Sequence, residues 1–354
     1  MAVRKESRGC TEMANKTRKC RSFNQKGAIY PASFLPTYIK NNLRFSRMKK
    51  MSLPPRDSMY SVPAPTVKGN CVFLGEFQPI GAKKVKISRT ILEQIGGAEW
   101  YVLNLESALC ATTPCRTSFS ILPRFAITLA EFKETLRPFG IPFEKLVVNI
   151  ANNHSFDKGE ASVKTTTELL KSLGCHVIGT KADPSYTIGG VRIVGCTTKL
   201  NPLSTPHASG LVQPDDLLFA ETIPTIPYVH WGWEYYEEPD ADTVALSQKW
   251  MSDECYNSSI IGIVGHGPHL LQKTVTINGG PCVYSLGDTL VRSKRPVSKG
   301  NPRALSGILR VQLEGGALSA FQMIPVLQEH TKEMITLVHP TTDDSRARFK
   351  ALYH

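Results

Sequence analysis

From residue 68 onward, short apolar runs alternate with amphipathic stretches of helical length. Short strands that alternate with helices pack as layers of helices on sheets, so the sequence predicts an α/β layered domain. Asp157 is placed to cap a helix that starts near residue 159. Turns at Asn278-Gly279-Gly280 and Glu314-Gly315-Gly316 are expected to close hairpins. Expected strands are 71–74, 100–103, 146–150, 176–178, 191–195, 228–229 and 260–264, and expected helices are 88–95, 129–139, 159–173 and 241–256.

Side chains that can bind a metal ion follow five of the expected strands. They are Glu76, Glu106, Asn153, His230 and His266. In open α/β sheets, ligands collect outside the carboxyl ends of the strands. We therefore expect these five side chains to converge at one edge of the domain.

The chemistry of these side chains favours a transition-metal centre. His269 follows His266 across the Gly267-Pro268 turn and adds a third imidazole. Two carboxylates, one amide oxygen and three imidazoles suit Mn, Zn or Fe better than Ca or Mg, and six ligands exceed the needs of one tetrahedral zinc. We expect two divalent ions, which would activate a water and polarise a phosphoryl or carbonyl oxygen. His154 is the candidate general acid for the leaving group.

Each motif also has a structural interpretation when it is taken alone. His154 is then a buried histidine with satisfied hydrogen bonds, and the Asn152-Asn153 pair caps a turn. Glu234 and Tyr235 either belong to a packed aromatic corner or help to bind substrate. The ordered series of motifs favours a site over these separate interpretations. Further candidates for substrate binding or ligand support are Asn152, Asp157, Glu234, Tyr235 and Asp288.

The order of the motifs over residues 70–326 resembles the CapA-type capsule synthesis family, which includes the poly-γ-glutamate biosynthesis protein and belongs to the calcineurin-like metallophosphoesterase superfamily. The resemblance implies a four-layer α/β/β/α sandwich with the site at one edge. The motifs that carry it are Gly75-Glu76, Asn104-Leu105-Glu106, Asn152-Asn153-His154 with Asp157 and Gly159, His230-Trp231-Gly232 with Glu234-Tyr235, Gly265-His266 with Pro268-His269, and Tyr284-Ser285-Leu286-Gly287.

The resemblance also implies a role for each matching residue. Glu76 would be the first metal ligand, where the family has Asp, and Glu106 would bridge the two metals. Asn153 would bind the second metal beside the general acid His154. His230, His266 and His269 would complete the two sites. The sequence departs from the family pattern at Gly267, where a second histidine is usual, and at Asp288, where Asn is usual.

The resemblance leaves three functions open, two of them enzymatic and one non-enzymatic. The first is a metal-dependent hydrolase or transferase that acts on a γ-glutamyl amide, or assists synthesis of poly-γ-glutamate or a related anionic polymer. The second is a phosphoesterase that uses the same ligands on a small phosphate ester. The third is a binding or scaffold protein that keeps the fold without turnover, a hypothesis suggested by Glu76 and Gly267.

Nearly all of the net positive charge of the chain lies in its N-terminal part. Residues 1–60 hold fourteen Lys and Arg residues against three acidic ones and so carry +11 of the formal charge of +12. The rest is close to neutral, which argues against nucleic-acid binding by the folded domain. We expect a disordered basic extension over 1–67, a folded domain over 68–330 and a tail over 331–354. The extension is a transit peptide, an arm for anionic surfaces, or sequence upstream of a true start at Met48 or Met51.

The nine cysteines are scattered, without a Cys-x-x-Cys pair. This spacing indicates neither a zinc knuckle nor a disulfide framework and is typical of small apolar residues in a reducing compartment. No apolar run reaches the length of about 18 residues that a membrane-spanning helix needs. The expected location is the cytoplasm, or an organelle if the basic extension is a transit peptide.

Overall fold

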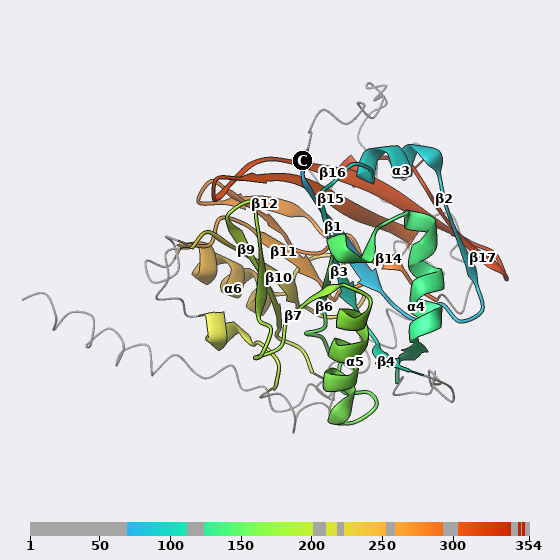
Figure 1. The fold of residues 1–354 in the computed structure, drawn as a ribbon. Coiled ribbons are helices and arrows are strands. Elements are labelled where there is room, and N and C mark those ends of the chain that lie inside the picture. Colours follow the sequence, from blue (N-terminus) through green and yellow to red (C-terminus); the bar gives the residue numbers. More distant parts are fainter. Residues whose placement is uncertain are drawn as a thin grey trace, which may run out of the picture.

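The computed structural model describes residues 69–111, 124–200, 210–217, 223–252, 259–292, 304–340, 346–347 and 349–350. The basic extension expected over 1–67 lies outside the described residues. The described residues form two large β-sheets that face each other, a small two-stranded sheet, and helices on both outer sides (Figure 1).

The larger sheet has nine strands in the order β2-β17-β16-β15-β1-β3-β6-β7, with β14 also paired to β1. β17 is paired with both β16 and β2. The segment 331–354, expected as a tail, therefore contains a strand of the main sheet. The strands are β1 (Cys71–Phe77), β2 (Lys84–Ile87), β3 (Trp100–Leu105), β6 (Leu146–Asn149), β7 (His176–Ile178), β14 (Asp288–Leu290), β15 (Leu305–Glu314), β16 (Ala317–His330) and β17 (Met334–Val338).

The smaller sheet has six strands in the order β12-β13-β11-β10-β9-β8. The expected hairpin turns are present: Asn278 and Gly279 connect β12 to β13 with positive φ angles of 47° and 81°, and Gly315 and Gly316 connect β15 to β16. The strands of this sheet are β8 (Ser185–Ile188), β9 (Val191–Thr197), β10 (Thr225–His230), β11 (Ile263–His266), β12 (Thr274–Ile277) and β13 (Gly280–Val283), and the two-stranded sheet pairs β4 (Ala108–Cys110) with β5 (Ala126–Thr128).

The alternation of side chains along each strand produces the layers. On β1, Phe73 packs against Tyr228 of the opposite sheet, with ring centroids 5.7 Å apart, whereas Val72 and Leu74 face the other way, into a helix-covered core. Because successive side chains point to opposite faces of a sheet, a strand buried on both faces reads as a continuous apolar run. The all-buried pattern of β1 has this cause.

Helices cover the outer faces of both sheets (Figure 1). The larger sheet packs against α3 (Arg89–Ile95), α4 (Leu129–Leu136) and α5 (Ala161–Ser172), and the smaller sheet packs against α6 (Ala241–Ser252). The four-layer α/β/β/α order that the sequence analysis expected is confirmed. Short 3-10 helices are η1 (Arg137–Phe139), η2 (Phe143–Lys145) and η4 (Pro214–Leu217).

The expected helices occur close to their predicted positions, but one predicted cap is wrong. Thr128 and Glu131 form a reciprocal capping box that fixes the start of α4. The N-cap of α5 is Glu160, which makes no side-chain cap bond. The carboxylate of Asp157 instead accepts hydrogen bonds from the backbone N–H of Phe125 and from the ring of His154.

Parallel pairing brings the carboxyl ends of several strands to one edge. Glu76 at the end of β1 is in register with Asn104 of β3, which is in register with Asn149 of β6. In the smaller sheet, His230 of β10 is in register with His266 of β11. The predicted convergence of strand ends therefore has a direct structural basis.

The cysteines are in two states. Cys71, Cys175, Cys196 and Cys282 are free and buried, and burial raises the pKa of each thiol, so they act as small apolar residues as expected. Cys110 is disulfide-bonded, which differs from the expectation of uniformly reduced cysteines.

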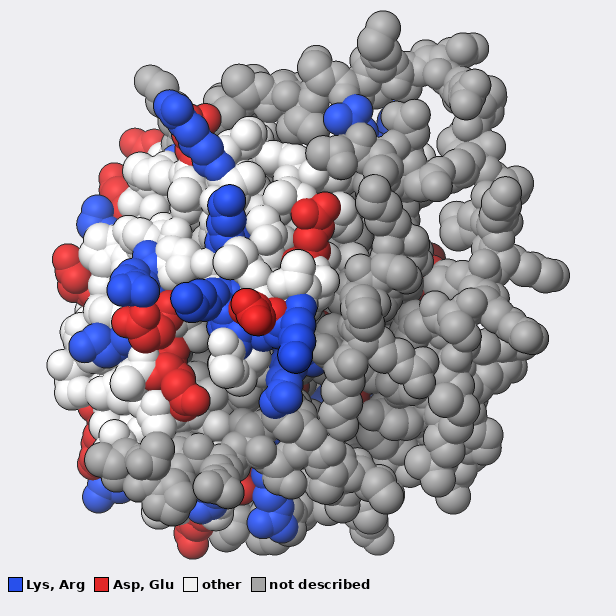
Figure 2. All heavy atoms as spheres, turned by 90° about the vertical axis from the view of Figure 1, so that its right-hand side faces the viewer, with Lys and Arg blue, Asp and Glu red and all other residues white. Residues whose placement is uncertain are grey.

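The described surface shows mixed charge. On the face turned to the viewer in Figure 2, Lys and Arg side chains are interspersed with Asp and Glu. This mixture agrees with the near-neutral charge of the sequence after residue 60. None of the helices within the described ranges is both long and apolar enough to cross a membrane.

Candidate metal centre

Glu76 is the central residue of the candidate site. It is fully buried near the end of β1, and its backbone N–H donates to the carbonyl oxygen of Gly287 at 3.1 Å. β14 approaches so closely here that a Cβ on Gly75 would lie 2.0 Å from that same oxygen. The glycine before Glu76 is therefore required by the close approach of β1 and β14, which brings Glu76 into register with Asp288.

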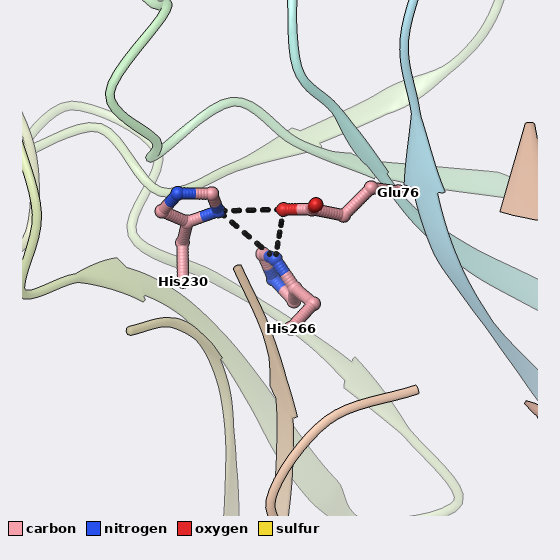
Figure 3. Close-up of side chains that lie close together, drawn as sticks. All are labelled: Glu76, His230 and His266. Carbon is pink, nitrogen blue, oxygen red and sulfur yellow. Dashed lines mark hydrogen bonds and ion pairs between the residues drawn. The ribbon is translucent and has the colours of Figure 1, made fainter. Parts of the chain in front are cut away.

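Two histidines of the smaller sheet face one oxygen of Glu76 (Figure 3). Glu76 Oε1 lies 2.8 Å from His230 Nδ1 and 3.3 Å from His266 Nδ1, and the two Nδ1 atoms are 3.2 Å apart. Because His230 and His266 are in register on neighbouring strands, their rings reach the same point. These three side chains form the first group with the geometry to hold a metal ion.

A second group uses the other oxygen of the same carboxylate. Glu76 Oε2 lies 2.5 Å from His269 Nδ1, which is also 2.8 Å from Asp288 Oδ1. Glu76, His269 and Asp288 together again have the geometry to hold an ion. Glu76 is thus common to both groups, whereas the resemblance implied Glu106 as the shared carboxylate.

The turn from His266 to His269 has no room for a side chain at Gly267. Gly267 has a φ of +119°, and a Cβ there would lie 2.3 Å from the carbonyl oxygen of Trp231. His269 has a φ of 60°, in the left-handed region. The departure from the family pattern at Gly267 therefore matches a tight turn that directs His269 toward Glu76.

Glu106 lies beside the second group. Its Oε1 is 3.9 Å from His269 Nε2 and 3.8 Å from His154 Nε2, and its Oε2 accepts a 2.7 Å hydrogen bond from Gln78 Nε2. Gln78 was not predicted as a site residue from the sequence. The signal was its position two residues after Glu76, because residues i and i+2 of an extended segment face the same side.

His154 is held in a fixed orientation next to Glu106. Its Nδ1 lies 2.5 Å from Asp157 Oδ2, and its ring stacks on Phe125 with centroids 4.0 Å apart. The bond to Asp157 places the Nδ1 proton, which leaves Nε2 on the side of Glu106. Nε2 is therefore the ring nitrogen that faces the candidate centre.

Amide side chains connect the loops below the site. Asn152 Oδ1 accepts from the backbone N–H of His154 at 3.0 Å, and Asn152 Nδ2 donates to the carbonyl of Leu105 at 2.8 Å. Asn152 thus fixes the loop to β3. Asn153 is buried in the same loop, with 7% exposure.

Two further asparagines, Asn104 and Asn149, were not selected from the sequence. Asn104 Nδ2 donates to Glu76 Oε1 at 3.5 Å, and Asn149 Nδ2 donates to Asn104 Oδ1 at 3.0 Å. Both amides are fully buried at the ends of parallel strands. A polar residue at the end of an otherwise apolar strand was the signal that could have identified them, because such groups are buried only with hydrogen-bond partners.

Glu234 and Tyr235 lie at the rim. The ring centroid of Tyr235 is 5.5 Å from that of His269, and the backbone N–H of Tyr235 donates to the carbonyl of Pro268 at 2.8 Å. The charge of Glu234 contributes to raising the pKa of Glu106, after the larger effects of burial and of Glu76. Both residues are partly exposed, in keeping with a place between the buried ligands and solvent.

Burial and mutual charge shift the titration of the cluster. Burial alone would raise the pKa of Glu76. The charges of His269 and His230 have a larger opposite effect and hold that pKa well below its ordinary value. Burial, followed by the charge of Glu76, raises the pKa of Glu106 well above its ordinary value. Burial lowers the pKa of His266 to about 4. Burial would also lower the pKa of His269, but Glu76, Asp288 and Glu106 raise it well above its ordinary value.

The donor set fits divalent transition metals. Glu106 Oε1 is buried without a hydrogen-bond partner, which is costly unless another group binds it. Mixed carboxylate and imidazole donors suit first-row ions such as Mn, Zn or Fe. The residues present therefore fit the metal ions that the sequence analysis expected.

The chain resembles two curated proteins over part of their length. It is 25% identical over 234 residues to the PGA biosynthesis protein CapA of Bacillus subtilis (strain 168), which covers 58% of this chain and 59% of that protein. It is also 25% identical over 214 residues to the Capsule biosynthesis protein CapA of Bacillus anthracis, covering 54% of this chain and 50% of that protein. The chain thus spans between half and three fifths of the length of these relatives.

Two solved structures from Thermus thermophilus show weak similarity. A hypothetical protein from this organism aligns with a TM-score of 0.39 and 13% identity, over 72% of this chain and 98% of that chain. The sulfate thiohydrolase SoxB in complex with glycerol aligns with a TM-score of 0.34 and 9% identity, over 83% and 61%. TM-scores this low support no conclusion about this chain.

A family model covers more than half of the sequence. The model described as Bacterial capsule synthesis protein PGA_cap matches residues 66–189 and 221–293. Both candidate metal-binding groups, and also Glu106 and His154, lie within these ranges. The chain therefore belongs to the bacterial capsule synthesis protein PGA_cap family.

Proposed function

We propose that this protein is a metal-dependent hydrolase or transferase that acts on the γ-glutamyl amide bonds of poly-γ-glutamate or a related anionic polymer. The observation that carries the proposal is the pair of metal-binding groups that share Glu76. The family, and the names of the relatives that mention PGA and capsule biosynthesis, supply the substrate class.

The residues of the cluster divide into holding and proton-transferring roles. Glu76, His230 and His266 would hold one ion, and Glu76, His269 and Asp288 would hold the other, with Glu106 and Asn153 as neighbouring oxygen ligands. Ions bound there would activate a water and polarise the carbonyl oxygen of the scissile amide.

His154 is the proposed general acid. In the hydrolytic reaction, water adds to the amide carbonyl, the C–N bond breaks, and the leaving nitrogen takes a proton to become an amine. His154 can supply that proton from Nε2, because Asp157 binds Nδ1 and Phe125 fixes the ring plane. Its position 3.8 Å from Glu106 places the acid at the edge of the metal ligands.

The test combines metal content with product release. The wild-type protein, purified without chelator, is expected to bind transition metal and to release amine groups from a γ-linked glutamate oligomer when Mn is added. His154→Ala should retain the metal but lose about 10²- to 10⁴-fold in kcat, the usual contribution of a positioned acid. A wild-type protein that neither contains nor takes up transition metal would refute the proposal.

The same experiment separates the alternatives. Phosphate release from an aryl phosphate, sensitive to His154→Ala and without amide cleavage, would assign the site to phosphoester hydrolysis. Metal binding with neither reaction would assign it to a binding role.

A further inference from the structure

Lys199 is a cation on a segment that is hydrogen-bonded to the candidate ligand His230, and the proposed mechanism does not use it. It lies two residues beyond the end of β9, whose last residue, Thr197, is in register with His230 of β10. The backbone N–H of Thr198 donates to the carbonyl of His230 at 2.9 Å, and Thr197 Oγ1 donates to the same oxygen at 3.2 Å. The segment that carries Lys199 is therefore fastened to a proposed metal ligand.

The ammonium group of Lys199 is held over an aromatic ring. Its Nζ lies 3.5 Å from the centroid of Trp233, which belongs to the loop that follows His230. Lys199 is half-buried, and burial lowers its pKa while the charges of Asp240 and Asp242 oppose that effect. A cation over a ring is stabilised by the electron-rich face but keeps its remaining N–H donors for another partner.

The nearby carboxylates do not neutralise Lys199. Within the described ranges, no carboxylate lies at ion-pair distance from its Nζ. Asp240 accepts from the backbone N–H of Thr243 at 3.0 Å and from Thr243 Oγ1 at 2.8 Å, which commits it to the start of α6. A partly desolvated ammonium without an anionic partner has a favourable interaction left to make.

We propose that Lys199, supported by Trp233, forms an anion-binding subsite that takes the free α-carboxylate of the γ-glutamyl residue at the scissile bond. This inference rests on the proposed function, because it assigns part of the same substrate to a second residue set. In a γ-linked glutamate chain, each residue keeps one free α-carboxylate close to its amide bond, so a substrate with its amide carbonyl at the centre would bring a carboxylate to the segment that carries Lys199.

Lys199 lies outside the residues that the family model matches, whereas Trp233 lies inside them. Residue 199 falls between the two ranges that the family model matches, 66–189 and 221–293. Lys199 belongs to neither candidate metal-binding group, so it would position the substrate without binding metal. Its loss should weaken substrate binding more than it slows the chemical step.

The experiment uses the full chain loaded with Mn and two probes. One probe is a γ-linked glutamate oligomer, and the other is the same oligomer with its α-carboxylates converted to carboxamides. Lys199→Met keeps the apolar stem over Trp233 and removes the charge, whereas Lys199→Arg keeps the charge. Lys273→Met is the matched control, because Lys273 already pairs with Glu238 at 3.0 Å.

We expect Lys199→Met to raise KM for the carboxylate oligomer about 10- to 100-fold, with kcat changed little, as for loss of a hydrogen bond to a charged group. KM for the carboxamide oligomer should not change, Lys199→Arg should restore most of the loss, and Lys273→Met should behave as wild type. Equal effects of Lys199→Met on both probes, or no effect on either, would overturn the inference.

A binding measurement keeps the two proposals distinguishable. Calorimetric titration of each oligomer in a His154→Gln background does not depend on turnover. If the protein binds the carboxylate oligomer through Lys199 but the wild type does not cleave it, the proposed reaction fails and the subsite stands. If cleavage occurs and Lys199→Met binds both oligomers like wild type, the subsite fails and the reaction stands. Absence of binding by the Lys199-containing protein refutes both.

Discussion

Replacing Glu76 by Gln tests whether one carboxylate serves both metal-binding groups. Its Oε1 lies 2.8 Å from His230 Nδ1, and its Oε2 lies 2.5 Å from His269 Nδ1. Glu76→Gln keeps the length of the side chain but removes its charge and turns one oxygen into an amide nitrogen that does not ligate metal. We expect this variant to lose both ions, whereas His230→Gln and Asp288→Asn, each confined to one group, lose one ion each.

The size of the effect follows from linkage between metal binding and folding. At a free metal concentration of about 100 times Kd, each bound ion stabilises the folded state by about 2.7 kcal/mol. If loss of a ligand weakens binding roughly 100-fold, that stabilisation falls to about 0.4 kcal/mol. The difference of about 2.3 kcal/mol per ion corresponds to a decrease of roughly 5–9 °C in the midpoint of thermal unfolding.

Plasma mass spectrometry of the purified proteins measures the metal content, and thermal unfolding with and without added metal measures the stabilisation. Circular dichroism of the metal-free proteins is the control for folding. A folded Glu76→Gln protein that retains two ions would refute the shared-carboxylate geometry. A difference of one ion between wild type and Glu76→Gln would show that only one of the two groups is a metal site.

Three further predictions concern the loops and protons around the centre. Gly267→Ala should lower the free energy of unfolding, measured by urea titration, by about 1–3 kcal/mol more than the control Gly279→Ala. A Cβ at residue 267 would lie 2.3 Å from a carbonyl oxygen, whereas nothing lies within 4 Å of a Cβ at residue 279; equal effects of the two substitutions would contradict the close approach at Gly267. Because the raised pKa values of Glu106 and His269 favour their protonated forms in the metal-free protein, metal binding should release protons and tighten as the pH rises, which calorimetry in buffers of different ionisation enthalpy measures; a pH-independent affinity would speak against it. Asp157→Asn should lower kcat about 10- to 100-fold without loss of metal, because it removes the carboxylate that orients the His154 ring, and a variant with full activity would exclude that role.

The sequence was sufficient to predict the layers and the convergence of strand ends. Parallel strands with coordinating residues at their carboxyl ends can bring those residues together at only one edge, and the registers of Glu76 with Asn104 and of His230 with His266 realise this. β17 is apolar except at Thr336, and it was missed because the polar segment 329–333 separates it from the preceding apolar pattern.

The hydrogen-bond partner of Asp157 was not predictable from the sequence, because several groups compete for its carboxylate. Asp157 stands where a helix cap is usual, but the ring of His154 and the backbone N–H of Phe125 take its carboxylate. Phe125 is 29 residues away from His154 along the chain, so no local pattern indicates this contact. The choice between a cap and a ring partner is decided by tertiary packing.

The residues at which this chain departs from the expected family pattern lie together around His269. The turn that contains Gly267 has no space for a second imidazole, because its backbone lies against Trp231. The carboxylate of Asp288, where the family usually has an amide, lies 2.8 Å from His269 Nδ1 and adds an anionic oxygen to the second group. Glu76, one methylene longer than the usual Asp, places its two oxygens against different histidines. The carboxylates of Glu76 and Asp288 thus both place anionic oxygens against His269.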